Sequence, residues 1–157
     1  MSSLNYVDDP APAASKFVKP FNYSSSVTLP GGIIKCSGQG GWSADGDIED
    51  VAEDYGAQVK RAFEDPISCL AKRPRLRKLN GKQNVDRLLR ANGLRGWEDV
   101  YSIRSYHVDA SQSFQPMVDL LKERLGDSHR PIWTVLGVKE LALPAMKIEI
   151  EVEAHKG

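Results

Sequence analysis

Three carboxylates alternate with apolar side chains in the C-terminal stretch KIEIEVEA, residues 147–154. The two-residue period predicts a β-strand that has Glu149, Glu151 and Glu153 on one face and the apolar side chains on the other. A carboxylate on such a face could act as a general base toward water, and an interfacial position could raise its pKa into a useful range. The alternation by itself favours the other reading, a solvated or salt-bridged polar face.

A second group of candidate site residues lies in CSGQGGWSADGD, residues 36–47. Its glycines are Gly38, Gly40, Gly41 and Gly46. The pattern predicts a turn or bulge, and the alternative is a backbone that closely approaches a ligand. Ser37 is typical of a strand-end hydroxyl bonded to backbone, since no histidine and acid accompany it in a nucleophile motif of a serine hydrolase. Cys36 alternates with Ser37, so we expect it to face the core.

The composition excludes several classes of protein. Lys plus Arg and Asp plus Glu both number 21 among 157 residues, so charge gives no reason to expect nucleic acid as a partner. The two cysteines, Cys36 and Cys69, have neither metal-ligand spacing nor a disulfide framework. No apolar run reaches membrane-helix length, and residues 1–15 do not have the pattern of a secretory signal. We therefore expect a cytoplasmic protein with no membrane partner.

The periodicity along the chain predicts the elements that must position these residues. We expect strands over residues 25–29, 33–37, 99–108, 132–138 and 147–154, and helices over residues 47–64, 84–93 and 111–127. The last helix has its apolar stripe at Phe114, Val118, Leu121 and Leu125, with Ser113 as its N-cap. The order predicts an α+β fold with a mixed sheet and two helices on one face, while water or another subunit covers the other face.

Two segments interrupt this scheme. Residues 1–20 are rich in Pro, Ala and Ser and are predicted to form a flexible arm, which leaves residues 21–157 as a single domain. The basic segment 65–83 splits a helical pattern that becomes continuous when the segment is removed. We interpret it as an exposed insertion in one amphipathic helix. Translated intron sequence is a second interpretation, and a nuclear-targeting or nucleic-acid role is disfavoured because no aromatic residue is interleaved.

Three motifs together resemble the Rid family of reactive intermediate deaminases, the YjgF-type proteins. They are IIKCSGQGG, GWEDVYSIRSYHVD and RPIWTVLGVKELALPAMKIEIEVEA, in this order over residues 23–154. The resemblance implies a chorismate-mutase-like ββαβαββ fold, a homotrimer with ligand clefts between subunits, and hydrolysis of enamines and imines without a cofactor. Some family members also suggest ribonuclease activity or inhibition of translation, which the neutral charge disfavours.

The resemblance also implies roles for individual residues. Tyr23 matches the family's cleft tyrosine, Ser37 its cleft serine, and Glu149 the carboxylate that positions or activates water. The arginine that binds the substrate carboxylate falls on Trp133 here, and Arg130 lies three residues upstream, where strand alternation would turn it to the opposite face. The chain is therefore a divergent member that lacks this arginine, and a cleft lined by Trp133 would favour an apolar or aromatic ligand.

These expectations give two hypotheses of function. In the first, the protein is an enzyme of a specialised biosynthetic pathway that acts on a small-molecule imine, enamine or enol intermediate by water addition or proton transfer. Glu149 is then the acid/base, Ser37 and the backbone near Gly38 orient the reacting group, and Tyr23, Trp133 and Arg130 contribute to the substrate pocket. In the second, the same fold binds a metabolite or a partner without catalysis.

Overall fold

The computed structural model describes residues 4–43, 51–63 and 84–157, and the following applies to those residues. The strands are β1 (Asn5–Val7), β2 (Ser26–Thr28), β3 (Ile33–Cys36), β4 (Gln39–Gly40), β5 (Val100–His107), β6 (Ile132–Gly137) and β7 (Ile148–His155). The helices are α1 (Pro12–Val18), α2 (Tyr55–Phe63), α4 (Asn84–Ala91) and α5 (Ala110–Leu125), with a short 3₁₀ helix η2 (Trp97–Asp99) before β5.

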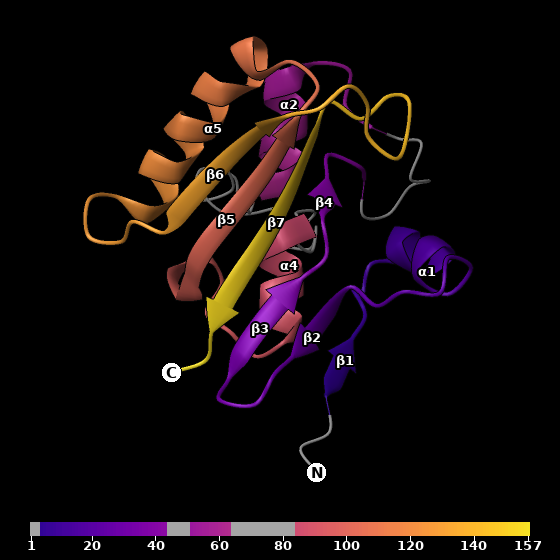
Figure 1. The fold of residues 1–157 in the computed structure, drawn as a ribbon, viewed down its shortest axis with the longest axis vertical. Coiled ribbons are helices and arrows are strands. Elements are labelled where there is room, and N and C mark those ends of the chain that lie inside the picture. Colours follow the sequence, from indigo (N-terminus) through magenta and orange to yellow (C-terminus); the bar gives the residue numbers. More distant parts are fainter. Residues whose placement is uncertain (1–3, 44–50, 64–83) are drawn as a thin grey trace, which may run out of the picture.

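The strands form one mixed sheet, in the order β1-β2-β3-β7-β5-β6, and β4 pairs with the beginning of β7. The neighbouring pairs are antiparallel except for β5 and β6, which are parallel. Figure 1 shows β7 in the middle of the sheet, with β5 and β6 on one side and β3, β2 and β1 on the other. The predicted α+β fold is confirmed, and the structure adds β1, β4 and α1 to the expected order.

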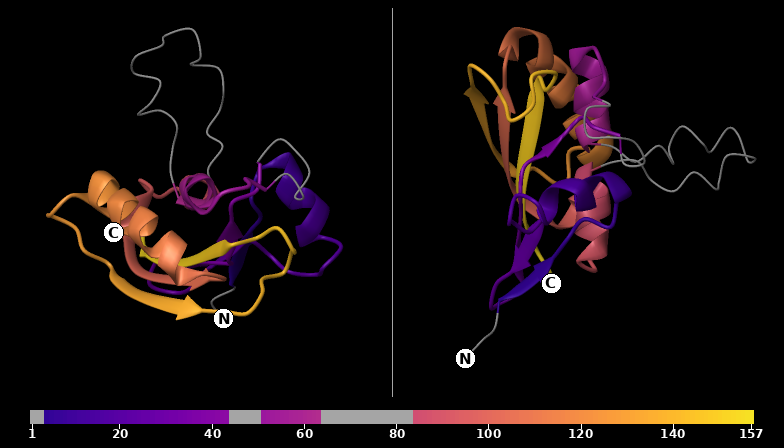
Figure 2. Two further views of the ribbon diagram at one scale, coloured as in Figure 1. Left: turned by 90° about the horizontal axis from the view of Figure 1, so that it is seen from above. Right: turned by 90° about the vertical axis from the view of Figure 1, so that its right-hand side faces the viewer.

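Helices α2, α4 and α5 lie on one face of the sheet, and no helix covers the other face (Figure 2). Side chains of β7 follow this division, because Ile148, Ile150 and Val152 are buried toward the helices and the carboxylates alternate with them. The buried core contains residues from the sheet and from all three helices, including Ile34, Phe63, Leu88, Met117 and Ile150.

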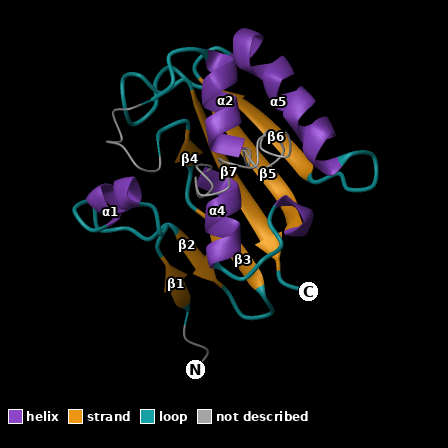
Figure 3. Cartoon of the chain, turned by 180° about the vertical axis from the view of Figure 1, so that it is seen from behind, coloured by secondary structure: helices purple, strands orange, loops and turns teal. Residues whose placement is uncertain are grey.

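Helices α2 and α4 lie end to end across the sheet (Figure 3). Their buried residues form one stripe, which runs from Val59 and Phe63 in α2 to Val85 and Leu89 in α4. This arrangement agrees with one amphipathic helix in two pieces. The predicted insertion at 65–83 itself lies outside the described residues.

The face that helix α5 turns to the core matches the predicted stripe in part, since Leu125 is buried and Leu121 packs against the core as predicted. Met117 and Leu120 are buried together with Leu125, whereas Phe114 is 44% exposed. The N-cap is Asp109, whose carboxylate accepts the backbone N–H of Ser111 at 2.9 Å. Ser113 is instead buried beneath the helix, where it bonds to His107, and this contact fixes the rotation of the helix.

The N-terminal segment has defined contacts that its composition did not indicate. Strand β1 pairs with β2 at the edge of the sheet, and α1 follows at the same edge. Asp9 is buried, and its carboxylate accepts two hydrogen bonds from the Arg87 guanidinium of α4, at 2.6 and 2.5 Å. The described part of the segment is thereby attached to the helix layer.

Candidate functional site

Glu149 lies on the uncovered face of β7, and its carboxylate lies against the backbone of Gly38. A Cβ atom at position 38 would overlap with this carboxylate, so a glycine is required for the observed placement. Strand β4 brings the two together, because Gly40 is the register partner of Glu149 in the antiparallel β4–β7 pair. The glycines of this stretch thus allow a close approach, here of a side chain to the backbone.

The two neighbouring carboxylates of β7 are both paired. Glu151 accepts hydrogen bonds from Arg104 Nη1 at 3.1 Å and from the Tyr106 hydroxyl at 2.8 Å. Glu153 accepts from Lys35 Nζ at 2.9 Å and from the Tyr101 hydroxyl at 2.7 Å. Glu151 and Glu153 therefore belong to a salt-bridged polar face. This is the interpretation that the alternation by itself favoured for all three carboxylates of β7.

Glu149 differs from both, since it forms no hydrogen bond or ion pair within the described part of the chain. Partial burial raises the pKa of its carboxyl group, and the negative charge of Glu151 raises it further. A carboxylate with free lone pairs and a raised pKa is suited to accept a proton from water.

Tyr23 and Ser37 lie next to this carboxylate. The backbone N–H of Ser37 donates to the carbonyl of Ser25 at 2.8 Å, which places the segment before β2 beside Gly38. Burial raises the pKa of the Tyr23 phenol, and the charge of Glu149 is the second cause, so the phenol remains a hydrogen-bond donor at neutral pH. The Ser37 hydroxyl accepts from Gln39 Nε2 at 3.3 Å, which leaves its own proton free to donate.

Two buried amide side chains of the helix layer position the site. The Asn84 amide at the start of α4 donates to the carbonyls of Gly40 and Trp42 at 2.6 and 3.2 Å, which fixes β4. The Gln58 amide of α2 donates to the Ala145 carbonyl at 2.8 Å and accepts the N–H of Lys147 at 2.8 Å, which fixes the entry to β7. The position of β4, which directly follows Gly38, and that of β7, which carries Glu149, thus depend on the two helices that flank the predicted insertion.

An apolar cluster beside the carboxylate was not among the predicted site residues. Trp42 and Met146 are buried and lie over Gly40, where a Cβ atom would be 2.6 Å from the indole and 2.7 Å from the methionine methyl group. Gly38 and Gly40 are two residues apart in an extended stretch, so a side chain at either position would point to the same face of the sheet. The alternate spacing of Gly38, Gly40 and Trp42 was the sequence signal for this cluster. It could be recognised only once the pairing of β4 with β7 was known.

Trp133 lies on the opposite face of the sheet from Glu149. It pairs with the buried Ile103 of β5, its ring stacks on Phe114 of α5 with centroids 5.4 Å apart, and its indole N–H donates to Ser105 Oγ at 2.8 Å. Within one chain it is therefore part of the packing between sheet and helix and does not line the space around Glu149.

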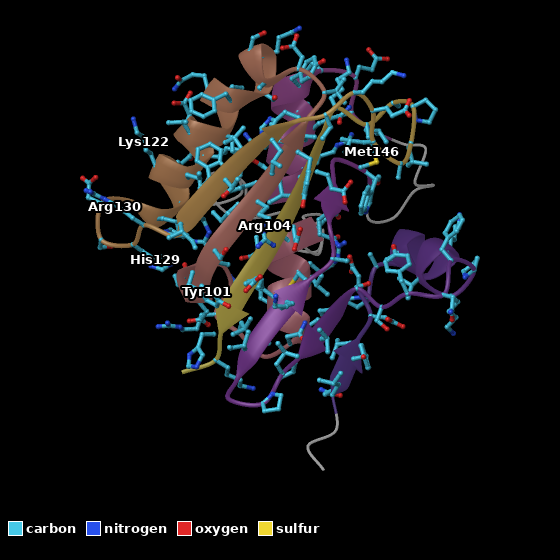
Figure 4. The ribbon with its side chains drawn as sticks, viewed as in Figure 1. Tyr101, Arg104, Lys122, His129, Arg130 and Met146 are labelled. Carbon is cyan, nitrogen blue, oxygen red and sulfur yellow. The ribbon has the colours of Figure 1, made fainter. Side chains whose placement is uncertain are left out.

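Arg130 is likewise not brought to Glu149 within one chain. It lies on the loop before β6, is largely exposed, and forms a long ion pair with Asp127 at 3.6 Å. Figure 4 shows Arg130 at the outer edge of β6, far across the sheet from Met146 beside β4. Tyr23, Ser37, Gly38 and Glu149 are thus gathered in one place, while Trp133 and Arg130 lie elsewhere.

The chemistry of the site follows from its donors and acceptors. Within the described ranges, no three His, Cys, Asp or Glu side chains are grouped so that they could hold a metal ion. Burial raises the pKa of the Cys36 thiol to about 12, so this neighbour of Ser37 stays protonated and is not a nucleophile at neutral pH. The arrangement can accept a proton at Glu149 and donate hydrogen bonds from Tyr23 and Ser37.

The endoribonuclease L-PSP family model matches residues 79–156 of this chain. The fold is similar to that of protein YJGH, with 23% identity, a TM-score of 0.72, and 98% of this chain and 97% of that chain covered. A member of the YjgF/YER057c/UK114 family from Mycobacterium tuberculosis is 21% identical, with a TM-score of 0.67 and 98% and 100% of the chains covered.

A third structure of the same fold is RidA from the Antarctic bacterium Psychrobacter sp. PAMC 21119. It is 23% identical, with a TM-score of 0.67 and 96% and 98% of the chains covered. No curated protein sequence matches the chain. None of the described helices is both long and apolar enough to cross a bilayer.

Proposed function

The chain belongs to the YjgF/Rid family, and from this we propose that it hydrolyses a small-molecule imine to a carbonyl compound and ammonia. The observation that carries the proposal is the unpaired Glu149 carboxylate, held against Gly38 beside the donors Tyr23 and Ser37.

The proposed reaction begins with attack of water on the imine carbon. Glu149 takes a proton from the water as the C–O bond forms, and the electron pair of the C=N bond moves to nitrogen. Glu149 then returns this proton to nitrogen, which gives a carbinolamine. In the second half of the reaction Glu149 takes the proton of the carbinolamine hydroxyl as the C=O bond forms and passes it to nitrogen as the C–N bond breaks, so that ammonia and a carbonyl compound leave. The Ser37 hydroxyl and the Tyr23 phenol are positioned to donate hydrogen bonds to the polar atoms of the substrate.

We propose in addition that the protein acts as a homotrimer in the cytoplasm. The support for the trimer is the sheet face that no helix covers, where Ile132 is 71% exposed. A contribution of Arg130 or Trp133 to the pocket would have to come from a second copy of the chain, because neither lies near Glu149 of its own chain.

The test is release of ammonia and 2-keto acid from imines that an amino-acid oxidase generates in situ, with side chains from small to aromatic. We expect Glu149→Gln to lower kcat at least about 100-fold, since general-base catalysis contributes a factor of this order, and Glu151→Gln to retain activity. If both variants match the wild type, Glu149 is not the base. Ligand binding without turnover in the wild type would establish the non-catalytic alternative.

The pH dependence of kcat/KM gives an independent check. The carboxylate form of Glu149 is the active base, so activity falls as the pH decreases through its raised pKa. Glu151→Gln removes a negative charge that raises this pKa, and we expect it to shift the acid limb of the profile toward lower pH. An unchanged or upward-shifted limb would contradict the assignment.

A further inference from the structure

A pocket of about 450 Å³ adjoins the Glu149 site at the N-terminal edge of the sheet. Its lining includes Tyr6, Asp8, Lys19, Asn22, Tyr23 and Ser24. Only Tyr23 of these residues has a role in the proposed reaction. The other lining residues come from β1 and the residue after it, from the turn after α1 and from the segment that leads into β2.

The pocket and the Glu149 carboxylate are neighbours through a short stretch of chain. Tyr23 and Ser24 line the pocket, and the next residue, Ser25, accepts the N–H of Ser37, which precedes the Gly38 backbone beneath Glu149. A ligand in the pocket that reaches past Tyr23 would therefore meet the carboxylate.

The N-terminal segment is fixed relative to the site. Arg87 bonds through its guanidinium to Asp9 and also to the Asn84 side-chain carbonyl at 2.8 Å, and the Asn84 amide holds the Gly40 carbonyl. Asp9, α4 and β4 thus form one connected set of contacts.

The turn that carries Lys19 is fixed as well. The Asn22 N–H donates to the Lys19 carbonyl at 3.2 Å, the Tyr23 N–H donates to the Val18 carbonyl at 3.1 Å, and Asn22 has a positive φ of 54°. Lys19 and Tyr23 consequently lie in one turn with a defined backbone.

Lys19 is the cation of this pocket. Two other cations of the uncovered face, Lys35 and Arg104, are paired with Glu153 and Glu151. Lys19 forms no ion pair or side-chain hydrogen bond within the described ranges. An ammonium group without a partner at the rim of a pocket is available to an anionic ligand.

We propose that Lys19 is the specificity-determining residue that binds the anionic group of the substrate, a role for which position 133 is unsuited in this chain. The inference rests on the proposed function for the location of the reacting atoms. It assigns the ligand class as small organic anions whose carboxylate lies at Lys19 and whose reacting carbon lies toward Glu149. Neutral analogues of the same shape lack the charge that the ammonium recognises.

The test measures binding of 2-oxobutanoate and of its neutral amide to the full-length protein by isothermal titration calorimetry. We expect Lys19→Ala to weaken 2-oxobutanoate binding about tenfold or more, because a hydrogen bond to a charged group contributes an effect of this size. Lys19→Arg should restore most of the affinity, and binding of the amide should be similar in all variants. Lys122→Ala, a lysine of α5 on the far side of the sheet, is the control and should bind as the wild type does.

The outcomes separate this inference from the proposed reaction. Equal affinity of wild type and Lys19→Ala, or no binding of 2-oxobutanoate to the wild type, would overturn the role of Lys19. Binding that depends on Lys19 in a protein that hydrolyses no imine would support Lys19 and refute the reaction. An equal loss of anion and amide binding in Lys19→Ala would show a structural effect and would also overturn the inference.

Discussion

The imidazole of His107 is held neutral by the order of its hydrogen bonds. Ser113 Oγ donates its proton to the Asp109 carbonyl at 2.7 Å, so it must accept from His107 Nδ1–H at 2.6 Å. Nε2 is then an acceptor for the Ser105 hydroxyl at 2.7 Å, and Ser105 Oγ accepts the indole N–H of Trp133. Each proton in this series of hydrogen bonds has one acceptor. Only the neutral Nδ1–H tautomer of His107 allows every one of these hydrogen bonds to form.

Burial lowers the pKa of His107, in agreement with this assignment. The unfolded chain therefore binds a proton at a pH where the folded protein does not, so the free energy of unfolding should decrease as the pH falls below the ordinary histidine value. The hydrogen-bond partners of His107 come from β5 and α5, and Ser105 links them to Trp133 of β6.

Trp133 links β6 to this series of hydrogen bonds through its indole N–H. We expect Trp133→Phe to lower the free energy of unfolding by about 1 kcal/mol, because it keeps a ring on Phe114 but removes the donor to Ser105. Trp133→Arg should cost more than about 2 kcal/mol, since it removes the aromatic contact and brings a charge against the core.

Urea unfolding of both variants checks this, with Glu140→Arg in the loop after β6 as a charge control. If the Trp133→Arg variant were as stable as the wild type, the contacts of Trp133 with Phe114 and Ser105 would not contribute to stability, which would contradict this prediction. The substitution is therefore a test of packing, and any gain of activity in it has to be judged against this loss of stability.

At the level of elements, the arrangement of α2 and α4 bears on the prediction that residues 65–83 are an insertion in one helix. The helices lie end to end and share a buried stripe, and each holds one strand of the site through Asn84 or Gln58. The apolar spacing on both sides of residues 65–83 predicts one helix, because the helical period continues from one side to the other when the segment is removed.

We expect a variant that lacks residues 65–83 to fold and to be at least as stable as the wild type. The gain can reach about 2 kcal/mol, the entropy of closing a loop of this length. Thermal unfolding and circular dichroism measure the outcome, with a Gly/Ser segment of equal length as the control. Loss of more than about 1 kcal/mol in the deletion variant would contradict the interpretation as an insertion.

Short elements were beyond the reach of the sequence patterns. Strands β1 and β4 contain three and two residues, too few for a periodic signal, and they exist through pairing with β2 and β7. The stripe of α5 was shifted because apolar spacing alone does not reveal that a polar Ser113 must face His107. The pairing of β4 with β7 is the detail that places Gly38 against Glu149.

At the scale of the whole molecule, the uncovered face requires an explanation. Ile132 and Leu136 of β6 share the face of Arg104 and Tyr106, because β5 and β6 pair in parallel register. We expect a homotrimer with three times the subunit mass of 17.4 kDa. Native mass spectrometry of the wild type and of Ile132→Asp together with Leu136→Asp tests this.

The double variant should be monomeric, since charges on an apolar interface oppose association. Lys122→Asp on α5 adds negative charge to the helix layer and should leave the assembly unchanged. A wild-type monomer would contradict the prediction. The sequence predicted a mixed sheet with one face that no helix covers, because the alternation along a strand shows which of its sides is apolar. The number of subunits cannot be derived from this alternation.

The ion pairs of the carboxylates on β7 also make the electrostatic potential vary along the uncovered face. Lys35 and Arg104 neutralise Glu153 and Glu151, while Glu149 at the other end of the strand has no described counter-charge. The local potential therefore becomes more negative toward Gly38. A protonated imine would be drawn toward Glu149 with its nitrogen in front, and it is more susceptible to attack by water than the neutral imine.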